Sequence, residues 1–117
     1  KDISKFISSA IKISKEVIPG SRCVVFGHIG DGNIHFNISQ PEKADKDKFL
    51  KKEKALRKEI INLTLGLKGS ISAEHGIGLT RKADLKKYMK KDVEVFKSIK
   101  KSFDPKNIMN PGKVIDI

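Results

Sequence analysis

Hydrophobic residues change from helical to alternating spacing within the first forty positions. Over residues 2–18 the apolar side chains recur every three or four positions with lysines between them, which predicts an amphipathic helix. Pro19-Gly20 is a typical stop signal for that helix. Residues 22–39 fit two strands joined at Asp31-Gly32, a dipeptide typical of a type I′ turn. The opening of the chain therefore predicts a helix followed by a β-hairpin.

A two-residue turn at Asp31-Gly32 would determine which residues face each other across the hairpin. It pairs His28 with His35 and Phe26 with Asn37, and it places all four on the same face as Asn33. The other face then carries only apolar side chains and is expected to lie on the core: Val25, Ile29, Ile34, Phe36 and Ile38. The prediction is a hairpin with one apolar face and one face bearing two opposed imidazoles.

Helical spacing returns further along the chain. Residues 46–67 predict a second helix, residues 84–89 a short one and residues 92–103 a longer one. Residues 70–73 are a candidate for a short strand. This order predicts an α+β fold, in which a small antiparallel sheet has helices packed on one face. A hairpin and one short strand make a thin sheet, so we expect a fragment of a larger protein that supplies further strands.

Composition sets outer limits on the class of protein. A length of 117 residues suits one domain or part of one. The single cysteine, Cys23, excludes a disulfide framework and suits a reducing compartment, so we expect a cytoplasmic location, where a parent protein could associate peripherally with the inner membrane. No apolar run approaches the ~20 residues that a transmembrane helix needs.

The formal net charge of +11 raises two classes of partner, nucleic acid and anionic lipid. Only three of the 25 basic residues are arginine, the residue best suited to bidentate phosphate and base contacts. The lysines are spread along every predicted helix, as on solvated helix faces. We therefore expect no nucleic-acid partner, and a basic module that binds nucleic acid or anionic lipid remains the alternative.

Three histidines and one acid are the candidates for chemistry. His28 and His35 could share a divalent cation, and Glu74, which lies among small residues and glycines, is the candidate third ligand. His75 is a candidate general base, because an imidazole titrates near neutral pH. Two imidazoles and a carboxylate suit Zn²⁺, Mn²⁺ or Fe²⁺. A regular strand would point Glu74 and His75 to opposite faces, so both reach one site only if the backbone turns beside Gly76.

Three motifs occur in order along nearly the whole chain: G-H-I-G-D-G-N-I-H-F-N, S-A-E-H-G-I-G and F-D-P-K-N-I-M-N-P-G-K. Together they resemble the C-terminal part of FAD-linked oxidases, a group that includes D-lactate dehydrogenase, D-2-hydroxyglutarate dehydrogenase and the flavin subunit of glycolate oxidase. The resemblance implies that residues 1–117 are the C-terminal substrate, or cap, domain of such an enzyme. Residues 104–117 would then be a tail that returns toward the flavin domain.

The same resemblance implies roles for individual residues. His28, His35 and Glu74 would bind the divalent metal, His75 would take the hydroxyl proton of a small 2-hydroxy acid, and Asn37 would hydrogen-bond that substrate. Asn110 would lie near the flavin. Hydride would pass from the substrate C2 to FAD, which an N-terminal domain of the same parent chain would hold. We expect the fragment alone to lack FAD and activity, and a non-catalytic metal-binding domain remains a second alternative.

Overall fold

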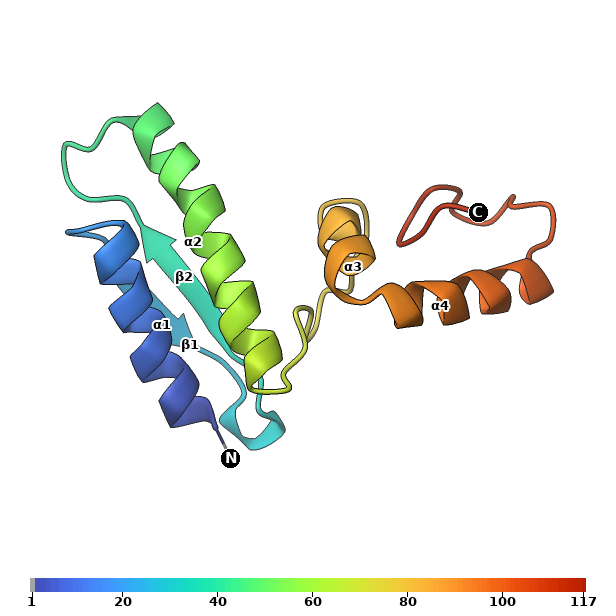
Figure 1. The fold of residues 1–117 in the computed structure, drawn as a ribbon, viewed down its shortest axis with the longest axis horizontal. Helices are drawn as coiled ribbons and strands as arrows, with labels where there is room; N and C mark the ends of the chain where they lie inside the picture. Colours follow the sequence, from blue (N-terminus) through green and yellow to red (C-terminus); the bar gives the residue numbers. More distant parts are fainter. Residues whose placement is uncertain (1) are drawn as a thin grey trace. The chain divides into compact units, whose positions relative to one another are not determined.

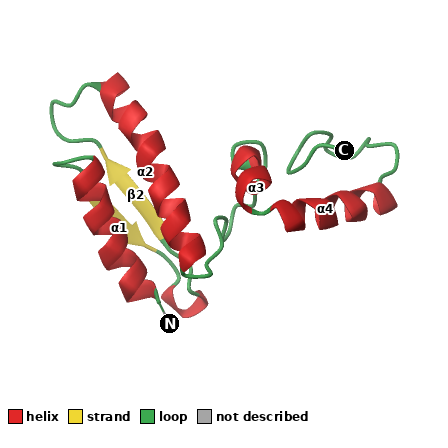
Figure 2. Ribbon diagram, in the orientation of Figure 1, coloured by secondary structure: helices red, strands yellow, loops and turns green. Residues whose placement is uncertain are grey.

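The helices and the hairpin occur in the predicted order. The computed structural model describes residues 2–117 (Figure 1). Its elements are α1 (Ile3–Val17), β1 (Arg22–Phe26), the 3-10 turn η1 (Ile29–Asp31), β2 (His35–Ser39), α2 (Lys46–Gly66), α3 (Lys82–Tyr88) and α4 (Lys90–Phe103). Helices and a two-stranded antiparallel sheet within these residues confirm the α+β class (Figure 2). No helix in residues 2–117 combines the length and apolarity needed to cross a membrane.

Two compact units make up the chain: an N-terminal unit, Lys1–Ala73, and a C-terminal unit, Glu74–Ile117. In the N-terminal unit, α1 packs against α2, and Figure 1 shows both helices on the same side of the hairpin. Ala10 and Ser14 are fully buried on α1, and their small side chains permit a close helix–helix approach. Leu56 on α2 is 1% exposed, and the Phe6 ring meets Phe36 of β2 edge-on at 6.1 Å between centroids.

The strand register differs from the sequence prediction. Phe26 lies opposite His35, and Val24 lies opposite Asn37, so the predicted pairs of His28 with His35 and of Phe26 with Asn37 are wrong. The strands end at Phe26 and begin again at His35, which leaves a loop much longer than two residues between them. His28 therefore lies outside the sheet, and no residue of β2 faces it across the ladder.

The loop closes around one carbonyl group instead of forming a type I′ turn. The His28 carbonyl accepts hydrogen bonds from the backbone N–H groups of Asp31 and Asn33, both at 3.1 Å. Gly32 ends η1 in the left-handed conformation at φ 73°. Gly27 has φ 153°, and a Cβ placed there would lie 2.2 Å from the Asn33 carbonyl oxygen. Glycine at position 27 therefore permits the chain to close.

The predicted faces of the strand residues are correct although the register is wrong. The observed pairing is shifted by two residues, and because side chains alternate between faces with a period of two, this shift leaves each strand residue on its predicted face. Val25 still shares a face with Phe36 on the side that meets α1, although its partner across the ladder is now Phe36 instead of Ile38. His35 and Asn37 still share the opposite face. Ile29, which the two-residue turn assigned to the core face, is 75% exposed because it belongs to η1 rather than to a strand.

The predicted strand at residues 70–73 is also wrong. That stretch contains bends and irregular backbone. The Ser70 hydroxyl donates to the Ser72 carbonyl at 3.0 Å and accepts the Ser72 N–H at 3.2 Å. Such local side-chain bonds give the backbone an alternative to a strand ladder. The helix predictions fare better: α2 ends within one residue of its expected position, and α3 and α4 each begin two residues early.

A small apolar cluster holds the C-terminal unit together. Leu85 of α3, Val93 of α4 and Ile115 of the tail form its buried centre. Ile77 of the E-H-G-I-G motif and Val114, the residue directly after the N-P-G-K segment, flank the cluster. The second motif and the tail after the third therefore meet at one hydrophobic core.

Candidate active site

His35 lies at the start of β2 on the sheet face opposite Phe36. Its imidazole stacks on the Phe26 ring with centroids 5.0 Å apart and an interplanar angle of 5°. This contact follows directly from the observed register, which places Phe26 opposite His35. Asn37 lies two residues along on the same face and is exposed. The face therefore presents an oriented imidazole and a carboxamide side by side along one strand.

His28 occupies a different setting from His35. It is the residue that precedes η1, and its side chain is exposed. The loop bonds to its carbonyl hold its backbone in place, because two N–H groups converge there. The structure thus holds both histidines in the N-terminal unit, one on a strand and one on an ordered loop.

Glu74 and His75 lie at the start of the C-terminal unit. The Nε2 atom of His75 is 3.6 Å from Oε2 of Glu74, a contact that becomes an ion pair when the imidazole is protonated. The two side chains are 33% and 83% exposed, respectively. No strand is present here, and Gly76 at φ 69° turns the backbone, so adjacent side chains converge instead of pointing to opposite faces. The backbone turn beside Gly76, which the sequence allowed but did not require, is therefore present.

Asn110 belongs to the tail and is exposed with φ 47°. The tail is anchored within its own unit: the Val114 N–H donates to the Gly78 carbonyl at 2.9 Å, and the Lys82 ammonium donates to the Gly112 carbonyl at 2.8 Å. Lys82 also pairs with Asp116, which lowers the pKa of that carboxyl. Asn110 and the E-H-G-I-G segment are therefore parts of one anchored substructure.

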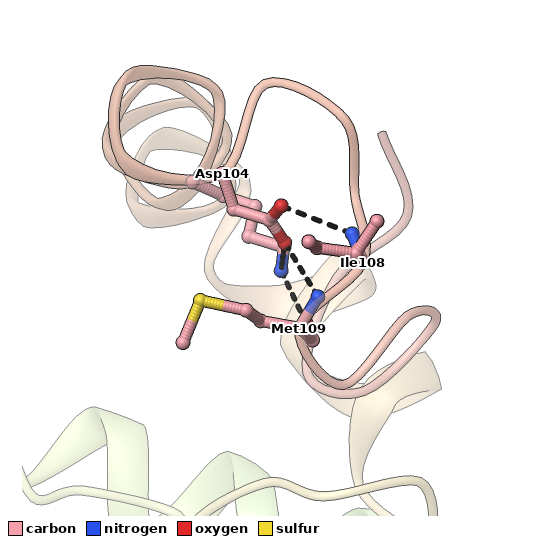
Figure 3. Close-up of polar contacts among 4 residues, drawn as sticks. Asp104, Ile108 and Met109 are labelled. Atoms are coloured by element: carbon pink, nitrogen blue, oxygen red, sulfur yellow. Dashed lines mark hydrogen bonds and ion pairs between the residues drawn. The ribbon is translucent and has the colours of Figure 1, made fainter.

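Asp104 is a residue that the sequence interpretation missed. It follows the last residue of α4 and is 5% exposed. One carboxylate oxygen accepts the Ile108 N–H at 3.0 Å and the other accepts the Met109 N–H at 2.9 Å (Figure 3). The Lys100 ammonium donates both to this carboxylate and to the Met109 carbonyl. The signal available in the sequence was an acid directly after a helix and just before a proline, at the point where the chain leaves the helix.

These bonds also change the acidity of Asp104. Its hydrogen bond to Lys100, helped by the Met109 and Ile108 amides, lowers the pKa of the carboxyl to about 2, although burial acts in the opposite direction. The group is consequently a carboxylate throughout the neutral range. It serves as a fixed acceptor for the backbone that leads to Asn110.

Comparison with known protein families gives the class to which the chain belongs. Residues 1–114 match the family described as FAD linked oxidases, C-terminal domain, and the chain belongs to that family.

Three relatives show how similar the chain is to individual proteins. The chain is 41% identical over 114 residues to D-2-hydroxyglutarate dehydrogenase of Stutzerimonas stutzeri, covering 96% of this chain and 24% of that protein. It is 40% identical over 96 residues to D-lactate dehydrogenase of Archaeoglobus fulgidus, covering 82% and 20%. With glycolate oxidase subunit GlcD of Bacillus subtilis it shares 39% identity over 90 residues, covering 76% and 19%. The chain thus spans about a quarter or less of the length of these relatives.

Proposed function

We propose that this chain is the substrate-side C-terminal part of a longer FAD-dependent D-2-hydroxy acid dehydrogenase. The observation that carries the proposal is the contact between Glu74 and His75, an exposed carboxylate and imidazole 3.6 Å apart at a turn. Family membership supports the redox chemistry, and the names of the relatives support a small 2-hydroxy acid as substrate. A parent of this kind would hold FAD mainly in its N-terminal domain, and the present chain alone would be inactive.

Metal binding is assigned to His28, His35 and Glu74. Two neutral imidazoles and a carboxylate are a donor set that fits Zn²⁺, Mn²⁺ or Fe²⁺. The partial exposure of the Glu74 carboxylate and the exposure of His28 leave both accessible to an ion. A bound divalent ion would act as a Lewis acid that lowers the pKa of the substrate hydroxyl.

The remaining roles belong to the protein's own side chains. His75, 83% exposed, is the proposed base that accepts the hydroxyl proton at Nε2, an atom 3.6 Å from the Glu74 carboxylate. Asn37 would orient the substrate through its carboxamide. The anchored turn that precedes Asn110 would hold that residue toward the flavin side. FAD, when bound by the parent, would supply the hydride acceptor.

A contrast between adjacent residues tests this assignment in the full-length parent. Glu74→Gln removes a ligand and its compensating charge, so we expect it to lose the metal and most of kcat while remaining folded. His75→Asn should keep the metal but lower kcat by roughly 10²–10⁴, the usual contribution of a general base. Metal content would be measured by mass spectrometry and chemistry by single-turnover flavin reduction.

Glu42→Gln is the matched control, since Glu42 is another exposed acid but lies in the loop before α2. It should retain metal and flavin reduction alike. Loss of metal from His75→Asn, or retention of metal by Glu74→Gln, would show that the two roles are exchanged or wrong. A parent that binds metal but never reduces flavin with D-lactate, glycolate or D-2-hydroxyglutarate would support a non-catalytic metal-binding domain instead.

A further inference from the structure

The Phe26 ring and the His35 imidazole lie flat against each other on one face of the hairpin. Their centroids are 5.0 Å apart and their planes differ by 5°. The strand register brings them together, because Phe26 of β1 is the residue directly opposite His35 of β2. The torsion that rotates an imidazole about its Cβ–Cγ bond is broad, so an imidazole on a strand has no strongly preferred plane of its own. The flat contact with Phe26 selects one plane for the His35 ring.

This contact lies at the end of the strand ladder. Phe26 and His35 form the last pair between β1 and β2. Beyond that pair the backbone leaves the strand at Gly27, whose φ is 153°, and continues into η1. The Phe26 ring therefore limits movement of the imidazole at the point where the regular sheet ends.

Burial in the core does not account for an aromatic residue at position 26. Phe26 is 55% exposed, and it lies on the face opposite Phe36, whose ring meets Phe6 of α1. Val24, two residues earlier on the same face, is 50% exposed. Phe26 thus contributes little to the core of the N-terminal unit, whereas its ring lies directly on a candidate metal ligand.

Stacking and metal coordination use different parts of an imidazole. The stack engages the face of the His35 ring, whereas a metal ion binds a ring nitrogen through the lone pair in the ring plane. The two interactions are therefore compatible. A ligand that is oriented beforehand loses less entropy on binding, and residues that orient a ligand contribute to metal affinity without touching the ion.

We infer that Phe26 is a positioning residue for His35, and that its ring fixes the imidazole plane for coordination of a divalent metal ion. The inference rests on the proposed function, in which His35 is a metal ligand. It requires the flat face of an aromatic ring at position 26, and an apolar side chain of similar size does not suffice.

Three variants of the full-length parent separate stacking from apolar bulk. Phe26→Leu keeps an apolar side chain but removes the ring, so the dissociation constant for Zn²⁺, titrated against a chromophoric chelator, should rise roughly 2–10-fold, as expected for one aromatic contact. Phe26→Tyr keeps the ring and should bind Zn²⁺ as the native parent does. Val24→Ala is the matched control, because Val24 is similarly exposed on the same face but lies opposite Asn37. It should leave the dissociation constant unchanged.

A spectroscopic measurement follows the imidazole itself and needs no metal. In the metal-free parent with isotope-labelled histidine, the Cε1–H proton of His35 is identified by its loss in His35→Gln. The ring current of Phe26 should displace its chemical shift, and Phe26→Leu should return the shift toward the value of the unfolded chain. Phe26→Tyr and Val24→Ala should leave it in place. A shift that Phe26→Leu does not change would show that the rings do not stack, and the inference would be overturned.

The two measurements distinguish failure of this inference from failure of the proposed function. Unchanged Zn²⁺ affinity in Phe26→Leu, or an equal loss in Phe26→Tyr or Val24→Ala, would overturn the positioning role and leave His35 as a ligand. A Zn²⁺ affinity that His35→Gln does not lower would overturn the proposed role of His35, and this inference with it.

Discussion

The two units of this chain reach order by different means. The N-terminal unit buries Ala10, Ile18, Leu56 and Ile61 between packed helices and a hairpin. The C-terminal unit has a smaller apolar centre, and it relies on polar anchors in its tail such as the carboxylate of Asp104. Most of the large exposed apolar side chains belong to the C-terminal unit, although it is the shorter one.

That difference separates a unit stabilised mainly by its own apolar burial from one that leaves more of its large apolar side chains exposed. Apolar burial supplies most of the favourable free energy of folding, so a unit that exposes Phe103 and Ile108 leaves part of it unused. Polar anchors cannot replace that free energy, because a typical hydrogen bond contributes only about 1 kcal/mol net. They can, however, determine which backbone conformation is presented. The following changes test this contrast.

Removing a core side chain of the N-terminal unit should have the largest effect. Leu56→Ala is expected to lower the free energy of unfolding by about 2–5 kcal/mol, because it deletes a fully buried side chain and leaves a cavity. Leu50→Ala, on the same helix but 44% exposed, should cost far less. Urea unfolding would measure the loss. Hydrogen exchange should accelerate in α1 and α2 and not in α4, and equal acceleration in α4 would mean that the two units unfold together.

A steric change in the hairpin loop should have an intermediate effect. Gly27→Ala would place a methyl group 2.2 Å from the Asn33 carbonyl oxygen, a contact so short that the backbone has to shift. We expect a loss of about 1–3 kcal/mol, the usual cost of overpacking. Gly30→Ala is the matched control, because no atom lies within 4 Å of a Cβ at that position. Identical unfolding free energies for the two variants would show that the loop readjusts.

The smallest effect concerns the hydrogen bonds of the Asp104 carboxylate, and it depends on pH. The folded pKa of Asp104 is about 2 and its ordinary value is 3.8, so the unfolded chain binds a proton more readily in that interval. The anchor's contribution is therefore complete above about pH 5 and is lost as the pH falls through 4 toward 2. The difference in unfolding free energy between the native protein and Asp104→Asn should shrink over the same interval.

Lys100→Met provides the companion measurement. It removes the contact that contributes most to the low pKa of Asp104, so the folded pKa moves back toward 3.8. The acid-dependent loss of stability should then begin at the same pH, end at a higher pH and be smaller. An acid profile that Lys100→Met leaves unchanged would assign the stability of the turn to the backbone amides of Ile108 and Met109 alone.

Local sequence information was enough for the helices, for the existence of the hairpin and for the partition of its strand faces. Helical and strand periods are properties of neighbouring residues, and each records which side of an element is buried. Small errors at the ends of α3 and α4 are within the usual ambiguity of helix boundaries. The choice of His28, His35, Glu74 and His75 as candidates also came from residue chemistry, and their roles remain proposals.

Contacts between residues further apart decided the rest. The register depended on a loop folded around the His28 carbonyl, which the Asp31-Gly32 pair alone does not encode. Ser70 formed local bonds in place of a strand. Likewise, the sequence showed Asp104 only as an acid after a helix, and its burial became evident when two amides and one ammonium group converged on it. The physical reason is common to all three: periodicity reports the average side on which residues lie, whereas hydrogen-bond partners depend on where the backbone turns.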